Sequence, residues 1–206
     1  EQTLQIVGLA TETVDVAANS SAKVIAEAVN DVSDRTGVAA TARTTATLGD
    51  LTADGTVYFT PFGSSTTGVS IAGSVTTSDL TGLVTSINDK TSATGISAAL
   101  NDNGSISLVS ATGDDIKIEN FRHSAAVTDT ASGGTENAVS MNITGGLGDA
   151  VTLTNGGTTA LATQSDSTVV GGKLTFSSDT SYTVSSDIEA TNGSLFSTGA
   201  DVSNGS

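Results

Sequence analysis

Apolar and polar residues alternate with a period of two in several short segments of the chain. The clearest are Val14–Val16, Val57–Phe59, Ile106–Leu108 and Ile116–Ile118. Successive side chains of a strand point to opposite faces, so this pattern predicts half-buried strands in antiparallel sheets. The pairs Asp54-Gly55 and Asn103-Gly104 stand beside such segments and predict tight hairpins, because Gly and Asn adopt positive φ at low cost.

Two other segments carry apolar residues at the spacing of a helix face. They are Ile25, Ala28, Val29 and Val32 in the first, and Leu80, Leu83, Val84 and Ile87 in the second. The i, i+3, i+4, i+7 spacing predicts helices near residues 20–35 and 78–92. Ser20 or Ser21 is the predicted N-cap of the first helix and Ser78 that of the second, and Gly37 and Gly95 are predicted to end them. Helices of about three turns are not stable alone, so each must pack on a sheet.

The two helical segments belong to an internal repeat. When Asn30 is laid over Asn88, residues 20–31 align with residues 78–89, and the apolar residues Ala22, Ile25, Ala26 and Val29 fall on Leu80, Leu83, Val84 and Ile87. At the same offset Asn30-Asp31 falls on Asn88-Asp89, and Thr36-Gly37 falls on Thr94-Gly95. The repeat predicts two copies of a β-hairpin, a helix and a further strand. We therefore expect a strand-dominated α+β fold.

From about residue 125 the helical spacing disappears and glycine clusters such as Gly145–Gly148 separate short alternating segments. Val151–Thr154 and Thr159–Leu161 around Asn155-Gly156 predict one hairpin. Lys173–Phe176 and Tyr182–Val184 around Ser178-Asp179 predict another. We expect three segments: a first repeat at 1–49, a second at 50–125 and a hairpin-rich segment at 126–206.

Charge and composition exclude several functions. The 206 residues include 7 Lys and Arg against 22 Asp and Glu, which gives a formal net charge of −15. The seven basic residues are scattered singly, so binding to nucleic acid or to an anionic membrane surface is not expected. The chain lacks cysteine, which excludes a disulfide framework, a thiolate zinc site and a cysteine nucleophile. No apolar run approaches the length of a membrane span.

Candidate catalytic and metal-binding residues are few. His123 is the sole histidine, and the surrounding Phe121–Ser124 contains no nucleophile elbow, so we expect a surface or strand-end histidine without a catalytic role. Asp114-Asp115 and Asn101–Asn103 are the densest oxygen clusters, but neither has the spacing of a calcium loop. We interpret both as turns with solvated side chains. The sequence therefore predicts no catalytic, cofactor-binding or metal-binding residue.

Two tripeptides match the N-glycosylation sequon, Asn142-Ile143-Thr144 and Asn192-Gly193-Ser194. In a chain so rich in Ser and Thr such matches arise by chance, and exposed hydroxyls are the better candidates for O-linked glycans. The glycines of Gly145–Gly148 do not stand between a strand and a helix, so they predict a loop and not a nucleotide-binding turn.

The repeated segment resembles the IN motif of bacterial flagellins and hook-associated proteins. The resemblance is carried by Ile87–Ala98, Gly104–Leu108 and Gly113–Ile118, with Val29–Ala40 as a more diverged first copy. Together the two copies cover roughly residues 3–122. The Lys173–Val184 segment is also similar to the strand pair through which many flagellins return toward their second conserved segment.

This resemblance implies a structural role without enzyme activity or cofactors. It implies an exported, extracellular outer region of a flagellar filament, which supports motility. Flagellins assemble through long terminal helices, and this sequence shows no sustained heptads. We therefore expect the central part of a flagellin, monomeric by itself, whose partners are other flagellin subunits joined through helices absent here. No binding residues are carried over from the family.

Two other classes of function stay open. One is an extracellular adhesive or carbohydrate-binding module, against which the scarcity of aromatic residues argues. The other is a secreted polysaccharide-active enzyme, which requires two carboxylates about 5–10 Å apart across a cleft.

Overall fold

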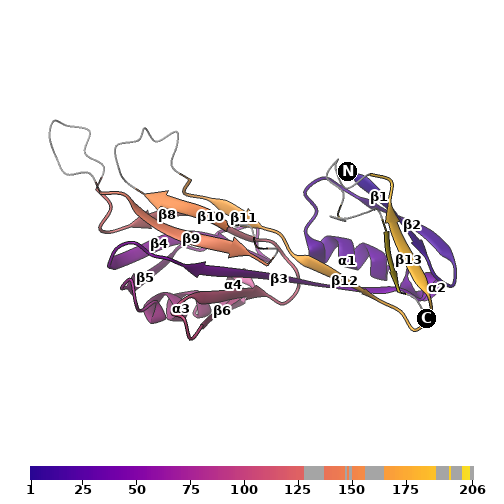
Figure 1. Cartoon of the computed structure of the whole chain (residues 1–206), viewed down its shortest axis with the longest axis horizontal. Helices are drawn as coiled ribbons and strands as arrows, with labels where there is room; N and C mark the ends of the chain where they lie inside the picture. Colours follow the sequence, from indigo (N-terminus) through magenta and orange to yellow (C-terminus); the bar gives the residue numbers. More distant parts are fainter. Residues whose placement is uncertain are drawn as a thin grey trace. The chain divides into compact units, whose positions relative to one another are not determined.

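The computed structural model describes residues 1–127, 137–146, 148, 150–155, 165–188 and 195, and the backbone of 201–204. It is strand-dominated with small helices and antiparallel sheets, which confirms the α+β expectation (Figure 1). The chain forms two compact units. Unit 1 comprises Glu1–Ala42 and Lys173–Ser206, and unit 2 comprises Arg43–Gly172. Unit 2 is therefore an insertion within the sequence of unit 1.

Unit 1 is a sheet covered by a helix. Its elements are β1 (Gln2–Val7), β2 (Thr11–Val16), α1 (Ala22–Asn30), α2 (Ser33–Thr36), the first part of β3 (Ala39–Gly49), β12 (Lys173–Ser177), β13 (Tyr182–Ser186) and β14 (Asp201–Asn204). The strand order is β14-β13-β1-β2, and β12 pairs with β3. Leu4 and Ile6 of β1, Val29 of α1 and Val184 of β13 are fully buried in one apolar cluster.

Unit 2 contains two sheets over a common core. Its further elements are β4 (Gly55–Phe62), β5 (Ile71–Val75), α3 (Thr81–Asn88), α4 (Thr91–Thr94), β6 (Ile96–Leu100), β7 (Ile106–Ser110), β8 (Ile116–His123), β9 (Val139–Gly145), β10 (Ala150–Asn155) and β11 (Thr168–Val170). One sheet has the order β10-β9-β3-β7-β6 and the other β11-β8-β4-β5. Leu48 and Ile106 from the first sheet, Val57 and Ile118 from the second, and Leu83 of α3 all belong to one buried cluster.

Both predicted helices are confirmed, and each consists of a longer helix and a single following turn. Gly37 and Gly95 end these turns with φ of 70°, as expected for a left-handed C-cap. Ser21 caps α1 by accepting a hydrogen bond from the amide of Val24 at 3.4 Å. The prediction that Ser78 caps the second helix was wrong. The carboxylate of Asp79 instead accepts from the amide of Thr81 at 2.9 Å, and hydrogen bonding to Thr81 lowers the pKa of Asp79.

The predicted hairpins had mixed outcomes. Asn103-Gly104 joins the paired strands β6 and β7, as expected. Asp54-Gly55 does not make a hairpin, because β3 and β4 lie in different sheets of unit 2. Strands β12 and β13 also lie in different sheets, so the predicted Lys173–Val184 hairpin was wrong. A turn signal marks where the chain reverses, whereas the partner of an amphipathic strand is selected by the shared core. The other predicted hairpin, with Thr159–Leu161, lies partly outside the described residues, and β10 pairs with β9.

The two repeats adopt the same topology. β1, β2, α1, α2 and β3 in the first correspond in order to β4, β5, α3, α4 and β6 in the second. Two later strands complete each copy: β12 and β13 pair with β3 and β1, as β7 and β8 pair with β6 and β4. The strands that complete unit 1 thus follow unit 2 in the sequence. The three predicted segments, 1–49, 50–125 and 126–206, follow the repeats along the sequence and stay a prediction. They describe something other than the division into units 1 and 2.

We predict that unit 1 folds without unit 2. In the variant, residues 43–172 are replaced by the five-residue Asn101–Ser105 turn, which connects the equivalent strands β6 and β7. The shortened chain keeps every strand and helix of unit 1 and its separate apolar cluster, so a cooperative thermal transition by circular dichroism is expected. Val29→Asp in the same chain is the control that must abolish the transition, and a non-cooperative melt of the parent deletion would contradict the prediction.

Candidate functional site

Each repeat contains an asparagine that closes the helix onto the next strand. The Asn30 side-chain amide donates to the Ala40 carbonyl at 2.9 Å and accepts from the Ala40 amide at 2.8 Å. In the second repeat Asn88 makes the same two bonds with Ala98, again at 2.9 and 2.8 Å. We call each pair an asparagine clasp. Only a carboxamide offers a donor and an acceptor in this arrangement, so the clasp pairs both backbone groups of one strand residue.

A buried threonine follows each clasp and orders the turn behind the helix. Thr36 donates its hydroxyl to the Val32 carbonyl at 3.1 Å and accepts from the Val38 amide at 3.2 Å. Thr94 makes the equivalent bonds with Lys90 and Ile96 at the same distances. Both threonines are almost fully buried. Their hydroxyls therefore satisfy backbone groups that would otherwise be unpaired in the core.

Two glycines that sequence reasoning missed allow the chain to approach these threonines. The carbonyls of Thr36 and Thr94 accept from the amides of Leu9 and Ser64 at 2.8 and 2.9 Å. A Cβ atom on the preceding Gly8 or Gly63 would lie 2.1 or 2.2 Å from the same carbonyl oxygens. Glycine is thus required at both positions because of a close backbone contact. The sequence did contain a signal for this contact, because in each copy one glycine directly follows the first strand.

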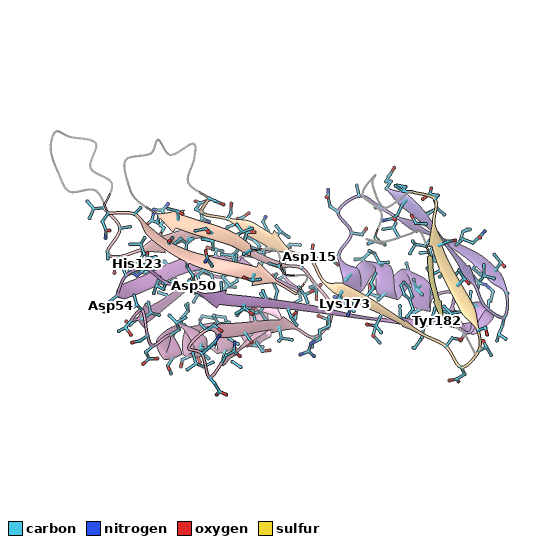
Figure 2. All side chains as sticks on the ribbon, viewed as in Figure 1. Asp50, Asp54, Asp115, His123, Lys173 and Tyr182 are labelled. Carbon is cyan, nitrogen blue, oxygen red and sulfur yellow. The ribbon has the colours of Figure 1, made fainter. Side chains whose placement is uncertain are left out.

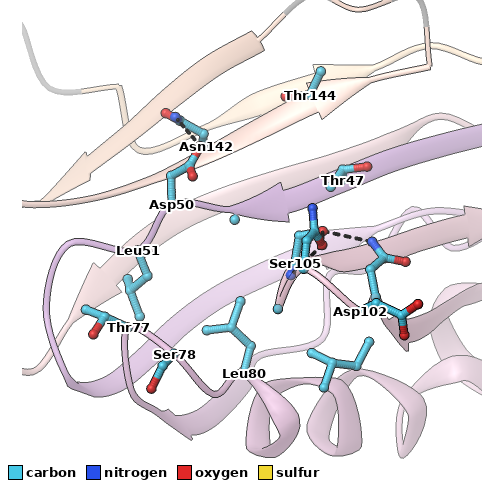
Figure 3. Close-up of a pocket in the computed structure, with 15 residues that line it drawn as sticks. Thr47, Asp50, Leu51, Thr77, Ser78, Leu80, Asp102, Ser105, Asn142 and Thr144 are labelled. Carbon is cyan, nitrogen blue, oxygen red and sulfur yellow. Dashed lines mark hydrogen bonds between the residues drawn. The ribbon is translucent and has the colours of Figure 1, made fainter.

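Unit 2 has a polar hollow of about 820 Å³ between the end of β3, the loop before α3, the β6–β7 turn and β9 (Figure 3). Asp50 and Asp102 line it, and the described residues of its lining include no histidine, lysine or aromatic side chain. Asn142 donates to the Asp50 carboxylate at 3.0 Å and accepts from the Thr152 hydroxyl at 2.7 Å. The side chains on this wall are thus engaged with one another.

The β6–β7 turn on the other wall of the hollow has its own hydrogen-bond network. Asn101 donates to the Ser105 hydroxyl at 2.8 Å and accepts from the Ser107 hydroxyl at 2.9 Å. Asn101–Asn103, one of the two oxygen clusters examined for calcium, is therefore part of a hairpin turn. The sequence predicts a turn at this cluster, and the structure places it in one.

His123 lies at the end of β8 with its ring buried, so of the two placements expected it takes the strand end and not the surface (Figure 2). Its Nδ1 accepts from the Ala125 amide at 3.1 Å, which places the proton of the neutral ring on Nε2. Nε2 is buried without a hydrogen-bond partner. Burial lowers the pKa of His123, and the charge of Asp54 opposes that shift. The ring is therefore held neutral by its surroundings.

Asp114 and Asp115, the second oxygen cluster, precede β8. The Asp114 carboxylate accepts from the Thr112 hydroxyl at 2.6 Å. Burial raises the pKa of Asp115, the Asp114 charge adds to the rise, and a hydrogen bond from Gly172 opposes it. Within the described part of the chain, no three Asp, Glu or His side chains come together as a metal site.

The sequon asparagine Asn142 lies in β9 and its side-chain amide is engaged by Asp50. The second sequon, Asn192-Gly193-Ser194, falls outside the described residues. None of the helices among the described residues is long and apolar enough to cross a membrane.

Comparison with known proteins identifies the motif that contains the clasps. Residues 3–55 and 56–112 each match the family described as the flagellin hook IN motif, and together these ranges cover more than half of the chain. The chain belongs to the flagellin hook IN motif family. Each matched range of this flagellin-family chain contains one asparagine clasp and the buried threonine that follows it.

One curated relative is the B-type flagellin of Pseudomonas aeruginosa, which is 31% identical over 170 residues. The match covers 82% of this chain and 32% of the relative, so the chain spans about a third of that flagellin. Among solved structures, the D2-D3 domains of the Escherichia coli flagellar cap protein FliD match at 16% identity and a TM-score of 0.30, over 70% of this chain and 96% of that one. A longer D1-D2-D3 structure of the same protein gives 17% and 0.26, over 70% and 53%.

The clasp predicts a specific stability loss. Asn88→Ala removes both hydrogen bonds to Ala98, which lie at the surface, so the free energy of unfolding of unit 2 should fall by about 0.5–1.5 kcal/mol. Urea denaturation measures this loss. Thr85→Ala on the exposed side of α3 is the matched control and should change stability by less than about 0.5 kcal/mol. Equal losses in both variants would contradict the role assigned to Asn88.

Neutral His123 predicts that stability depends on pH. Because its pKa in the folded chain lies below the ordinary 6.5, the unfolded chain binds a proton first as the pH falls. The His123 contribution is therefore complete above about pH 6.5 and declines as the pH falls toward the lower pKa of the folded state. Urea denaturation at several pH values should show this decline, and His123→Gln, which retains an acceptor for Ala125, should reduce it. Identical pH profiles for the two chains would show that another group titrates.

Proposed function

We propose that this chain is a surface-exposed outer region of a bacterial flagellar filament subunit, with a structural role that supports motility. The observation that carries the proposal is the nested arrangement of two IN copies. Strands from both ends of the chain, β1 and β14, belong to the four-stranded sheet of unit 1, and unit 2 is inserted into unit 1. A projection that leaves a filament core once and returns once needs its entry and exit in the same unit, and the shared sheet of β1 and β14 supports this.

The surface chemistry suits the same role. A formal charge of −15 on 206 residues disfavours association with like-charged copies. The isolated chain is therefore proposed to be monomeric, exported and extracellular, and to join other flagellin subunits through helices outside this sequence. No catalytic role is proposed, because the described residues that line the hollow include no aromatic side chain on which a sugar ring could stack.

A carbohydrate-binding or adhesive role is the second candidate, and the polar hollow is the observation that favours it. The hydrogen bonds of Asn142 and Asn101 within the chain leave few groups free to bind a sugar hydroxyl. A glycan array distinguishes the candidates. Saturable binding that is lost in Asp102→Ala would support a carbohydrate site, and no binding would remove it.

Filament labelling tests the structural proposal. Antibody fragments raised against unit 2 and coupled to gold should decorate filaments of the source bacterium along their whole length in electron micrographs. Deletion of residues 43–172 from the chromosomal gene should leave filaments that assemble, are not labelled and have a smaller diameter. A strain lacking the whole subunit is the control. Label confined to the filament tip, or absent from filaments, would contradict the proposal.

A further inference from the structure

The turn that joins β6 and β7 contains an asparagine with an unusually polarised side chain. Asn103 is exposed, and its Oδ1 accepts two hydrogen bonds from Ser105, one from the backbone amide at 3.1 Å and one from the hydroxyl at 2.7 Å. The Ser105 hydroxyl in turn accepts from Asn101 at 2.8 Å, which orients it toward Asn103. Two donors therefore converge on one side-chain carbonyl oxygen.

This arrangement is that of an oxyanion hole. Attack on the Asn103 Cγ atom would place negative charge on Oδ1, where both Ser105 donors already point. The available nucleophile is the backbone nitrogen of Gly104, which closes a five-membered ring with Cγ. Gly104 has no side chain to obstruct ring closure, and a Cβ atom there would meet only the Ser78 carbonyl oxygen, at 3.9 Å. The turn thus supplies the electrophile, its stabilising donors and a nucleophile from a residue without a side chain.

We propose that Asn103-Gly104 is a self-modifying site at which the native turn promotes deamidation. The Gly104 nitrogen forms a bond to Cγ and loses its proton, while the Cγ–Nδ2 bond breaks and Nδ2 leaves with that proton as ammonia. The product is a succinimide. One water molecule then opens the ring at either carbonyl and yields aspartate or isoaspartate at position 103. The reaction requires no oxidant, reductant or metal.

The structure singles out this site among the asparagines of the two repeats. In both clasps the side-chain amide is a hydrogen-bond donor to a strand carbonyl, and the following amide, of Asp31 or Asp89, is bonded within the helix end at 3.0 Å. The Gly104 amide donates to the Asn101 carbonyl at 2.9 Å. A second backbone bond, from the Asn101 amide to the Ser105 carbonyl at 2.8 Å, also spans the turn. The Gly104 bond lies at the exposed tip, where it opens more readily than the end of a packed helix.

The modification would change the rim of the polar hollow. Asn103 and Asp102 both line it, with Asp50 on the opposite wall. Each conversion adds one negative charge to a chain already at −15. Isoaspartate also lengthens the main chain by one methylene in the turn that sets Leu100 opposite Ile106.

The test uses the full native chain, aged at mildly alkaline pH and compared with the same chain in denaturant. Peptide mapping by mass spectrometry should find a gain of about one dalton at Asn103, with isoaspartate detected by enzymatic carboxyl methylation, and no change at Asn30 or Asn88. Ser105→Ala removes one donor and should slow conversion about tenfold. Ser107→Ala, whose hydroxyl contacts Asn101 and not Asn103, is the matched control and should convert nearly as fast as the parent chain.

Two results would overturn the proposal. One is conversion in Ser105→Ala that is as fast as or faster than in the parent chain, with circular dichroism showing that the variant is folded. The other is faster conversion of Asn103 in denaturant than in the native chain, because that result would mean that the native turn slows deamidation instead of promoting it. The second comparison uses the unmodified sequence, so it remains decisive if Ser105→Ala fails to fold.

Discussion

The asparagine clasp is the interaction on which each repeat depends. A helix of two to three turns is too short to persist alone, and its attachment to the next strand leaves backbone groups at the strand's start without a ladder partner. Asn30 and Asn88 supply those missing partners from the last residue of each helix. The buried threonine and the left-handed glycine that follow then fix the direction in which the strand leaves. The asparagine, the threonine and the glycine therefore occur together in both repeats, because all three are needed to end the helix and start the next strand.

The nested topology follows from the same units. A copy that ends with β3 or β6 still has open strand edges, and two more strands pair with these edges and complete the core. In unit 2 those strands come next in the sequence. In unit 1 they come only after the whole of unit 2, so one copy is closed by distant residues. Each unit nevertheless buries its own apolar cluster, which is the condition for independent folding.

The polar side chains of the chain act mainly on the chain itself. Asn142, Asn101 and the clasp asparagines are bonded internally, and His123 is buried as a neutral ring. A surface composed of hairpin turns and hydroxyl groups, with few aromatic residues, suits a structural projection better than a cleft for chemistry. Asn103 is the exception, since its carbonyl is polarised at an exposed turn and its neighbour is a glycine.

The local pattern was enough to predict the helices, the two C-capping glycines, the repeat and the strand-dominated class, because these depend on contacts between residues close in sequence. The apolar stripe through Leu83 and the turn at Asn103-Gly104 are examples. The pairing of β3 with β7 and β9, and of β13 with β1, was decided only by the tertiary structure. An alternating strand specifies that one face is buried but not which neighbour buries it, and the need for Gly8 arises from a carbonyl 28 residues away. Local energetics thus determine the elements, and the packing of a shared core determines their partners.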